Sequence, residues 1–380
     1  MIYFDAGATT LEKPEAVRHA MARAVATMSS PGRGTYPASR QAEETAYQCR
    51  SEAAELFGMD LPENVIFTEN ATHGLNIAIK SLVKPGSRVV ISGYEHNAVT
   101  RPLYTIPNVR LTVVDTLPFQ PGAMAEEFAR ALQQGADVVI CNHVSNVFGC
   151  IQPVDEIADL CRRYGVPLIV DASQSAGVLP VRMDEWQAAF IAMPGHKGLY
   201  GPQGTGLLLC NHDTHTLMEG GTGSMSRQQQ MPEDLPDRLE AGTHNMPGIA
   251  GLLEGIRFVR RRGVDKICRQ EQNLTEYAAR RLEMMDEVQL FTDGEFINQT
   301  GVLSFLVAGR DCEEIGEKLA QRGIAVRAGL QCAPLAHRTA GTLRGGTVRF
   351  SASVFNTMSQ VDRFAAELQD IIREDVKIKA

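Results

Sequence analysis

The chain has 380 residues, of which 44% are hydrophobic and 22% charged, and its formal net charge is -8. These values are ordinary for a globular protein, and the length predicts two or three domains of roughly 100–200 residues each. The acidic balance argues against a nucleic-acid partner, because nucleic-acid-binding proteins usually carry a basic surplus. We interpret the basic run Arg260–Arg262 as a solvated helix face. No apolar run approaches the roughly 18–20 residues of a membrane helix, so we expect no membrane partner.

The N-terminal sequence and the cysteine pattern predict the cellular compartment of the protein. Met-Ile-Tyr-Phe-Asp is not a basic start followed by a long apolar run, so it does not resemble a signal peptide. The eight cysteines form no C-x-x-C pair, and we expect no metal site. We therefore expect a cytoplasmic protein with free thiols. Most of the cysteines are typical of core positions, but Cys332 differs because it lies in a predicted loop with Gly329 and Pro334.

Between about residues 65 and 210, short apolar segments rich in valine and isoleucine alternate with amphipathic ones such as Pro153–Tyr164. Seven segments are predicted strands: Val65–Thr68, Arg88–Gly93, Arg110–Asp115, Asp137–Val144, Pro167–Ala172, Ala188–Met193 and Gly206–Cys210. This alternation predicts an α/β fold with a mainly parallel seven-stranded sheet. Ligands of such sheets bind at the carboxyl ends of the strands.

After about residue 250 the pattern changes. Helices are predicted over Ile249–Arg262, Asp265–Met285, Cys312–Arg322 and Met358–Asp375, and strands over Gly301–Ala308, Ile324–Ala328 and Thr347–Ser353. This mixture predicts a smaller C-terminal α+β domain. We expect a large domain over residues 15–250 and a small domain over residues 251–380, with residues 1–14 packing near the active site.

Polar residues gather where the predicted strands end. Asp171 ends Pro-Leu-Ile-Val-Asp, and Lys197 follows Ala-Phe-Ile-Ala-Met-Pro within Gly-His-Lys-Gly. Further residues of this kind are Asn70, Thr72, His73, Glu95, His96, Asn97, His143, Asn146 and Gln174. A parallel sheet would bring these side chains to one edge.

These residue types suit pyridoxal-phosphate chemistry. A lysine such as Lys197 forms an imine with the cofactor's aldehyde, and an acid such as Asp171 keeps the pyridine nitrogen protonated. Thr72 opens a predicted helix, whose free N–H groups favour a phosphate. Taken singly, each residue has a plainer interpretation as a turn residue, a solvated lysine or a core histidine. Only their ordered combination favours the cofactor.

Several motifs follow one another along nearly the whole chain. They are Tyr-Phe-Asp-Ala-Gly-Ala-Thr-Thr at 3–10, Glu-His-Asn-Ala at 95–98, His-Val-Ser-Asn-Val-Phe-Gly at 143–149, Asp-Ala-Ser-Gln at 171–174, Gly-His-Lys at 195–197, Glu-Ala-Gly-Thr at 240–243, Arg-Ala-Gly-Leu-Gln-Cys-Ala at 327–333 and Arg-Phe-Ser-Ala-Ser-Val-Phe-Asn-Thr at 349–357. Through these motifs the chain resembles the class-V aminotransferase superfamily. Within that superfamily it resembles the SufS-like second group of cysteine desulfurases and selenocysteine lyases. The resemblance implies a homodimeric fold-type I transferase dependent on pyridoxal 5'-phosphate.

The resemblance also implies a role for each matched residue. Lys197 would carry the cofactor as an aldimine, Asp171 would contact the pyridine nitrogen, and Gln174 the ring hydroxyl oxygen. His96 would stack on the ring and act in catalysis. The remaining cofactor contacts would come from Thr72, His196 and Asn146, and from Thr243 of the partner subunit.

For the substrate, the resemblance implies that Asn146 and Arg349 bind the carboxylate and that Cys332 accepts the sulfur. The alternative for Arg349 is a structural ion pair. Because the reaction needs a thiolate, we expect Arg327 or His337 to place positive charge near Cys332.

Three positions depart from the family pattern. Pro194 stands where the family usually has a serine that binds phosphate, Gly198 is an extra glycine after the lysine, and Gln331 stands where relatives often have histidine.

We therefore expect a cysteine desulfurase that converts L-cysteine to L-alanine and leaves a persulfide on Cys332 for an acceptor protein. The sequence does not identify the acceptor. One alternative is a selenocysteine lyase acting on L-selenocysteine, and another is a class-V aminotransferase or β-eliminating lyase, which would need no Cys332. A non-catalytic protein that kept the fold is a third, and the presence of both Lys197 and Asp171 argues against it.

Overall fold

The computed structural model describes residues 1–32 and 34–379, with side chains as far as residue 374. Its centre is a seven-stranded sheet in the order β2-β8-β7-β6-β5-β3-β4. The strands are β2 (Val65–Thr68), β3 (Arg88–Ser92), β4 (Arg110–Val114), β5 (Val138–Asn142), β6 (Leu168–Asp171), β7 (Phe190–Pro194) and β8 (Gly206–Cys210). All seven predicted strands are present. Only β8 runs against its neighbours, so the prediction of a mainly parallel sheet is confirmed.

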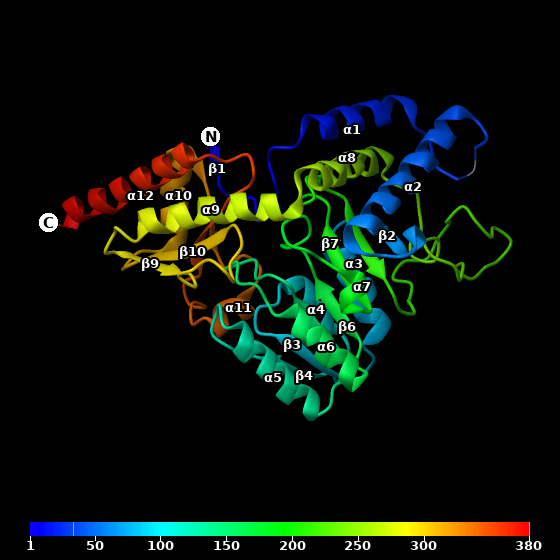
Figure 1. Cartoon of the computed structure of the whole chain (residues 1–380), viewed down its shortest axis with the longest axis horizontal. Coiled ribbons are helices and arrows are strands. Elements are labelled where there is room, and N and C mark those ends of the chain that lie inside the picture. Colours follow the sequence, from blue (N-terminus) through cyan, green and yellow to red (C-terminus); the bar gives the residue numbers. More distant parts are fainter. Residues whose placement is uncertain (33, 380) are drawn as a thin grey trace.

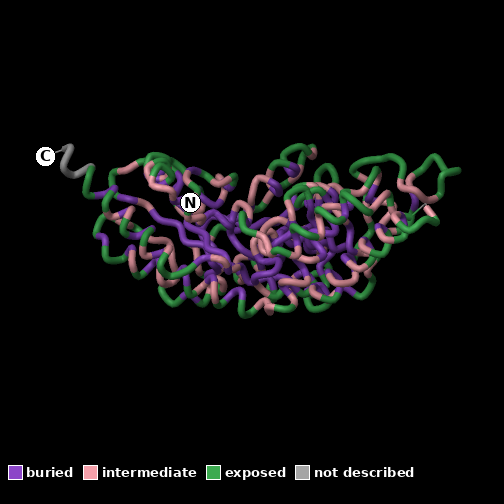
Figure 2. The backbone as a smooth tube through the Cα atoms, turned by 90° about the horizontal axis from the view of Figure 1, so that it is seen from above, coloured by how far each residue is buried: buried purple, intermediate pink, exposed green. Residues whose placement is uncertain are grey.

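The central strands are buried on both faces, which explains their continuous apolar sequences. Successive side chains of a strand point to opposite faces. Val139 and Cys141 of β5 accordingly belong to one hydrophobic core, and Val138 and Ile140 belong to another. Figure 2 shows buried segments running through the middle of the molecule, with exposed segments mostly around its rim.

Helices cover this sheet. They are α1 (Glu15–Thr27), α2 (Pro37–Phe57), α3 (Ala71–Leu82), α4 (Asn97–Thr105), α5 (Pro121–Gln133), α6 (Val154–Tyr164), α7 (Met183–Trp186) and α8 (Met246–Arg262). Helices α1 and α2 pack on α8, although about 200 residues of chain separate them (Figure 1). Residues 211–245, all described, form a long connection without a helix or strand. No helix among the described residues is long and apolar enough to cross a membrane.

The C-terminal part contains α9 (Val264–Leu282), β9 (Val288–Phe291), β10 (Val302–Val307), α10 (Cys312–Gln321), β11 (Ile324–Ala325), β12 (Arg327–Gly329), α11 (Pro334–Thr339), β13 (Thr347–Ser351) and α12 (Met358–Lys379). Its antiparallel sheet has the order β12-β13-β10-β9. The predicted strand Ile324–Ala328 is two strands, because β11 pairs with β1 (Ile2–Tyr3) while β12 pairs with β13. The N-terminus thus lies beside the C-terminal part (Figure 1).

The domain boundary expected at residues 250 and 251 falls inside α8. Met246, Leu253 and Ile256 of this helix share a core with the large sheet. In α9, Leu274 and the residues after it pack in the core of the C-terminal part. The boundary remains a prediction, and these cores favour a position near Gly263, between the two helices.

Candidate active site

A cavity of about 210 Å³ lies at the carboxyl ends of β5, β6 and β7, where Asn142, Asp171 and Pro194 line it. The predicted site residues that line the cavity are Thr72, His96, Asn146, Asp171, Gln174, His196 and Lys197. The structure therefore brings together most of the residues that sequence reasoning selected.

Lys197 follows β7 on a loop that backbone contacts hold closely. Burial lowers the pKa of its ammonium group to about 8, and the nearby Asp171 opposes part of this shift. A Cβ atom on Gly198 would lie 2.4 Å from the carbonyl oxygen of Ala176. The extra glycine therefore allows two backbone segments to approach each other just after the lysine.

The N-terminal segment packs on this loop. The carbonyl oxygen of His196 accepts hydrogen bonds from the Thr10 backbone N (3.1 Å), Thr10 Oγ1 (3.0 Å) and Lys13 Nζ (2.8 Å). The Nδ1 atom of His196 lies 3.0 Å from Thr9 Oγ1. Burial, together with the charges of Lys197 and Lys13, lowers the pKa of His196 to about 4, so its imidazole is neutral at pH 7.

Asp171 and Gln174 lie on the β6 side of the cavity. Asp171 is buried, and its Oδ1 accepts a hydrogen bond of 2.9 Å from the Ser173 backbone N. Gln174 donates from Nε2 to the carbonyl oxygen of Gly7 at 2.9 Å. The N-terminal motif and the aspartate motif, more than 160 residues apart in sequence, therefore meet here.

Two helices begin at the cavity. Asn70 caps α3 by accepting a hydrogen bond from the His73 backbone N, and Thr72 lies in the first turn. His96 caps α4, and its Nδ1 accepts from the Ala98 backbone N at 3.0 Å. Its remaining nitrogen, Nε2, then carries the proton of the neutral ring, and burial lowers the pKa of His96. The unpaired N–H groups of a helix start favour an anion such as phosphate.

Arg349 is almost fully buried in β13 and holds both a carboxylate and the Asn146 backbone. Its NH2 atom lies 2.7 Å from Asp5 Oδ1, and its NH1 donates to the carbonyl oxygen of Asn146 at 2.8 Å. The structural ion pair considered as an alternative is therefore present. Buried side-chain atoms almost always have partners, yet Arg349 Nε and Asn146 Oδ1 have none among the described residues. Asn146 lines the cavity, whereas Arg349 is not among its lining residues and lies directly behind Asn146.

Cys332 is exposed, whereas the other seven cysteines are buried, as predicted. It lies in a turn where Gln331 and Cys332 both have left-handed backbone conformations, with φ of 41° and 57°. Neighbouring segments hold this turn. Asn146 Nδ2 donates to the Gln331 carbonyl oxygen, and the Asn97 backbone N donates to that of Cys332, both at 2.8 Å. The turn therefore contacts the cavity wall at Asn146 and the start of α4.

His337 does not supply the positive charge that we expected near Cys332. It is fully buried, and burial lowers its pKa to about 4, so it is neutral at pH 7. Its Nε2 lies 2.8 Å from Gln331 Oε1 and its Nδ1 lies 2.7 Å from Thr342 Oγ1. Sequence reasoning missed this link, because no spacing rule pairs Gln331 with His337. It also missed Asp5, which pairs with Arg327 at 2.9 Å as well as with Arg349.

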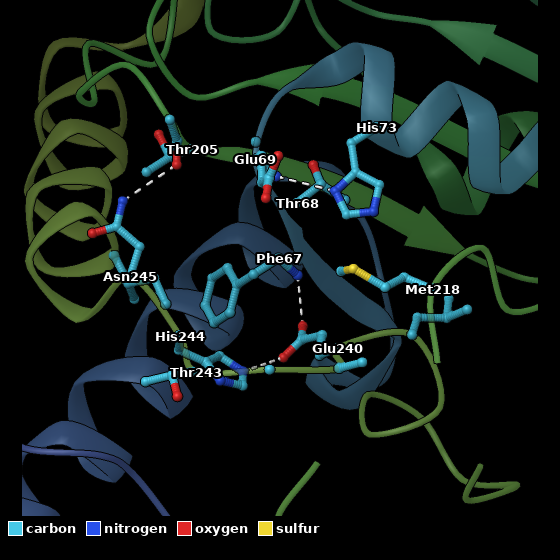
Figure 3. A pocket seen from close by; sticks show the side chains of 16 residues that line it. Phe67, Thr68, Glu69, His73, Thr205, Met218, Glu240, Thr243, His244 and Asn245 are labelled. Carbon is cyan, nitrogen blue, oxygen red and sulfur yellow. Dashed lines mark hydrogen bonds and ion pairs between the residues drawn. The ribbon is translucent and has the colours of Figure 1, made fainter. Parts of the chain in front are cut away.

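Thr243 does not line the Lys197 cavity within one chain. It is exposed in a second cavity with Phe67, Glu240 and His244, shown in Figure 3. Glu240 organises this region by pairing with Arg50 at 2.6 Å, with His244 Nε2 at 2.5 Å and with the Phe67 backbone N at 2.6 Å. The contribution of Thr243 to a partner's site remains a prediction.

Comparison with known proteins gives the family. The model for class-V aminotransferases matches residues 2–364. The chain belongs to the class-V aminotransferase family. It is 33% identical to a probable cysteine desulfurase of Mycolicibacterium paratuberculosis, over 98% of this chain and 55% of that protein. It is 30% identical to a probable cysteine desulfurase of Pyrococcus abyssi, over 98% of this chain and 94% of that protein. The chain spans 55% and 61% of the first two curated relatives it matches.

Solved structures of this family have the same fold. The apo structure of a cysteine desulfurase from Thermococcus onnurineus has a TM-score of 0.90 at 29% identity, covering 98% of this chain and 95% of that one. The cysteine desulfurase CsdA from Escherichia coli has a TM-score of 0.85 at 23% identity, over 98% and 94% of the two chains, which shows the fold alone. The predicted fold-type I architecture with a smaller C-terminal domain is confirmed.

Enzymes of this family use pyridoxal phosphate, and the residues of the Lys197 cavity fit it. A lysine with a lowered pKa and a buried carboxylate stand at neighbouring strand ends, the start of α3 faces the same space, and Asn146 Oδ1 is an unpaired buried acceptor. A lysine whose pKa is lowered toward neutral pH suits attack on an aldehyde, since only the uncharged amine is nucleophilic.

Borohydride reduction of the cofactor-loaded protein should attach the cofactor to Lys197. The reason is that Lys197 lines the cavity together with Asp171 and the start of α3, whereas Lys13, whose pKa burial also lowers to about 8, does not line it. Peptide mass spectrometry locates the adduct, which Lys197→Ala should lose and Lys80→Ala, in the last turn of α3, should keep. An adduct on any other lysine would show that the cavity has been assigned wrongly.

Proposed function

We propose that this protein is a pyridoxal-phosphate-dependent cysteine desulfurase, which converts L-cysteine to L-alanine and retains the sulfur as a persulfide on Cys332. One observation carries the proposal. The exposed cysteine lies in a turn that is hydrogen-bonded to Asn146, on the wall of the cavity that contains Lys197 and Asp171. An aminotransferase needs no such thiol. The names of the relatives support the same activity.

The cavity residues would hold the cofactor by chemically distinct contacts. Lys197 would bind its aldehyde and Asp171 its pyridine nitrogen, with Gln174 at the ring hydroxyl oxygen and His96 stacked on the ring. Thr72 and His196 would hold the phosphate, with Thr243 of the partner subunit. Pyridoxal phosphate, when bound, supplies an electron sink for the bond breaking at the substrate Cα.

Asn146 and Arg349 would orient the substrate by its carboxylate. Asn146 Nδ2 uses one of its two N–H groups on Gln331 and keeps the other, and Arg349 keeps its Nε–H. Asn146 also holds the Cys332 turn, and Arg349 holds the Asn146 backbone. The reaction requires the substrate sulfur and the Cys332 sulfur to meet. A carboxylate bound at Asn146 would place the substrate side chain near the Cys332 turn, which would satisfy this requirement.

Proton and sulfur transfer would then use Lys197 and Cys332. With a pKa of about 8, the Lys197 amine can accept the Cα proton and return it near neutral pH. The Cys332 thiolate would attack the substrate sulfur, forming an S–S bond as the substrate C–S bond breaks. The carbon skeleton takes up the released electron pair and protons to become L-alanine, and the persulfide remains for an acceptor protein.

Three features support the wider setting that we propose. Thr243 is exposed in the second cavity and does not line the Lys197 cavity of the same chain. This position suits a residue that would contact the cofactor of the partner subunit in a homodimer. All eight cysteines are free, which suits the reducing cytoplasm. The exposed Cys332 suits transfer to an acceptor protein. L-Selenocysteine would fit the same contacts, and comparing the turnover of the two amino acids tests that preference.

Arg349→Lys should raise the KM for L-cysteine by roughly 10-fold or more, which is the scale of losing a hydrogen bond to a charged group. Lysine retains the charge opposite Asp5 but cannot reproduce the guanidinium geometry. Arg344→Lys, on an exposed loop, is the matched control and should leave the KM unchanged. A lower melting temperature in Arg349→Lys with an unchanged KM would instead assign Arg349 a purely structural role.

A single turnover of L-cysteine without reductant should add one sulfur atom to Cys332, as detected by peptide mass spectrometry. Cys332→Ala should still bind the cofactor and the substrate, but its alanine production should fall by roughly 100-fold or more, as expected for loss of a nucleophile. Cys268→Ala, on α9, should behave as the unmodified protein does. Sulfur on another cysteine, or full activity of Cys332→Ala, would refute the proposal.

A further inference from the structure

Glu95 is a completely buried carboxyl group, and no cationic side chain in the described part of the chain pairs with it. It follows β3 and precedes His96, and none of its side chain is accessible. Its Oε1 lies 2.6 Å from Ser92 Oγ and accepts a hydrogen bond of 2.7 Å from the Asn142 backbone N. Its Oε2 has no partner among the described residues. A buried carboxylate would leave its charge uncompensated here, which is costly in a protein interior.

The hydrogen bonds around Ser92 show where a proton must lie. Asn142 Nδ2 donates to the carbonyl oxygens of Tyr94 (3.0 Å) and Val144 (3.2 Å), so the amide orientation is determined and Asn142 Oδ1 is an acceptor. Ser92 Oγ lies 2.8 Å from this Oδ1 and 2.6 Å from Glu95 Oε1. A serine hydroxyl has one hydrogen and cannot donate to both acceptors. If Glu95 were ionised, one of these short contacts would join two acceptors without a hydrogen.

A proton on Glu95 Oε1 satisfies every contact. Glu95 then donates to Ser92 Oγ, and Ser92 donates to Asn142 Oδ1, while Oε1 still accepts from the Asn142 backbone N. A hydroxyl oxygen can donate and accept at once, whereas an amide nitrogen only donates and an amide oxygen only accepts. A glutamine at position 95 would therefore lose one of these hydrogen bonds.

The surrounding charges favour the same state. Among the described residues, Asp171 of β6 and Cys141 of β5 interact electrostatically with Glu95, and neither is cationic. Asn142 is the register partner of Asp171 in the sheet and also lines the cavity. Burial raises the pKa of Glu95 to about 8, and Asp171 adds to this effect, while the short contacts with Ser92 and Asn142 oppose it.

We propose that Glu95 is a positioning residue that is held as a neutral carboxylic acid. It joins the end of β3 to Asn142 of β5 and thereby supports Asp171 and the adjoining His96. By staying neutral, it avoids placing a second negative charge near Asp171, which would repel that carboxylate. Its importance for turnover rests on the proposed function, but its protonation does not.

Infrared difference spectra between the unmodified apoprotein and Glu95→Gln test the protonation directly. At pH 7 the unmodified protein should show a protonated-carboxyl C=O band that Glu95→Gln lacks. Glu126→Gln, exposed on α5, should remove only a carboxylate signal. A carboxylate signal lost from Glu95→Gln would overturn the proposal. If that variant does not fold, Ser92→Ala should shift the same C=O band, and an unshifted band would equally overturn it.

Unfolding at several pH values gives an independent readout. Folded Glu95 keeps its proton to a pH of about 8, whereas the unfolded residue releases it near pH ~4.3. Stability from this group is therefore greatest below pH ~4.3 and is lost as pH rises toward 8. Relative to Glu95→Gln, the unfolding constant of the unmodified protein should rise about tenfold per pH unit between these values. Parallel pH profiles would contradict the proposal.

Activity separates this inference from the proposed function. In the loaded enzyme, Glu95→Gln should lower kcat for alanine release by about tenfold, because the misplaced Asp171 and His96 act mainly after substrate binds. If Glu95→Gln keeps the kcat of the unmodified protein while the unmodified protein shows the C=O band, Glu95 is protonated but its positioning role is refuted. Absence of alanine release in the unmodified protein, with the band present, would refute the desulfurase instead.

Discussion

The parallel arrangement of β3, β5, β6 and β7 places their carboxyl ends at one edge of the sheet, and the candidate site depends on this constraint. The strands can run side by side because helices cover both faces and every residue of β5, β6 and β7 is buried. At the edge, Asp171 and the Lys197 loop come from neighbouring strands. Burial there lowers the pKa of Lys197 while the nearby Asp171 opposes part of this shift, so the packing that stabilises the sheet also sets the chemistry of the lysine.

The second requirement is that the C-terminal part be held against this edge, and Asp5 does so. It pairs with Arg349 of β13 and Arg327 of β12, next to the parallel pairing of β1 with β11. Removing one partner of a buried ion pair costs about 3–5 kcal/mol, because the other charge is left unpaired. Arg349 also holds the Asn146 backbone, and Asn146 holds the Cys332 turn. The substrate contacts and the proposed sulfur acceptor therefore belong to one network.

Much of this arrangement could be predicted from the sequence, because buried parallel strands have continuous apolar sequences that end in polar residues. All seven strands of the large sheet and the gathering of Asp171, Asn146 and Lys197 followed from that pattern. Contacts between distant segments could not be predicted in this way. The short strand β9 was missed, the split between β11 and β12 depends on pairing with the N-terminus, and the neutral state of His337 depends on complete burial.

The central claim is that the Lys197 cavity and the Cys332 turn together transfer sulfur from cysteine. The most direct measurement is product analysis after the loaded enzyme is mixed with stoichiometric L-cysteine without added reductant, because excess L-cysteine is itself a thiol that would remove the persulfide sulfur. We predict one L-alanine and one Cys332 persulfide per active site, with the persulfide sulfur released as sulfide only when a further thiol is added. Formation of pyruvate, ammonia and sulfide, or transfer of the amino group to a keto acid, would contradict the account.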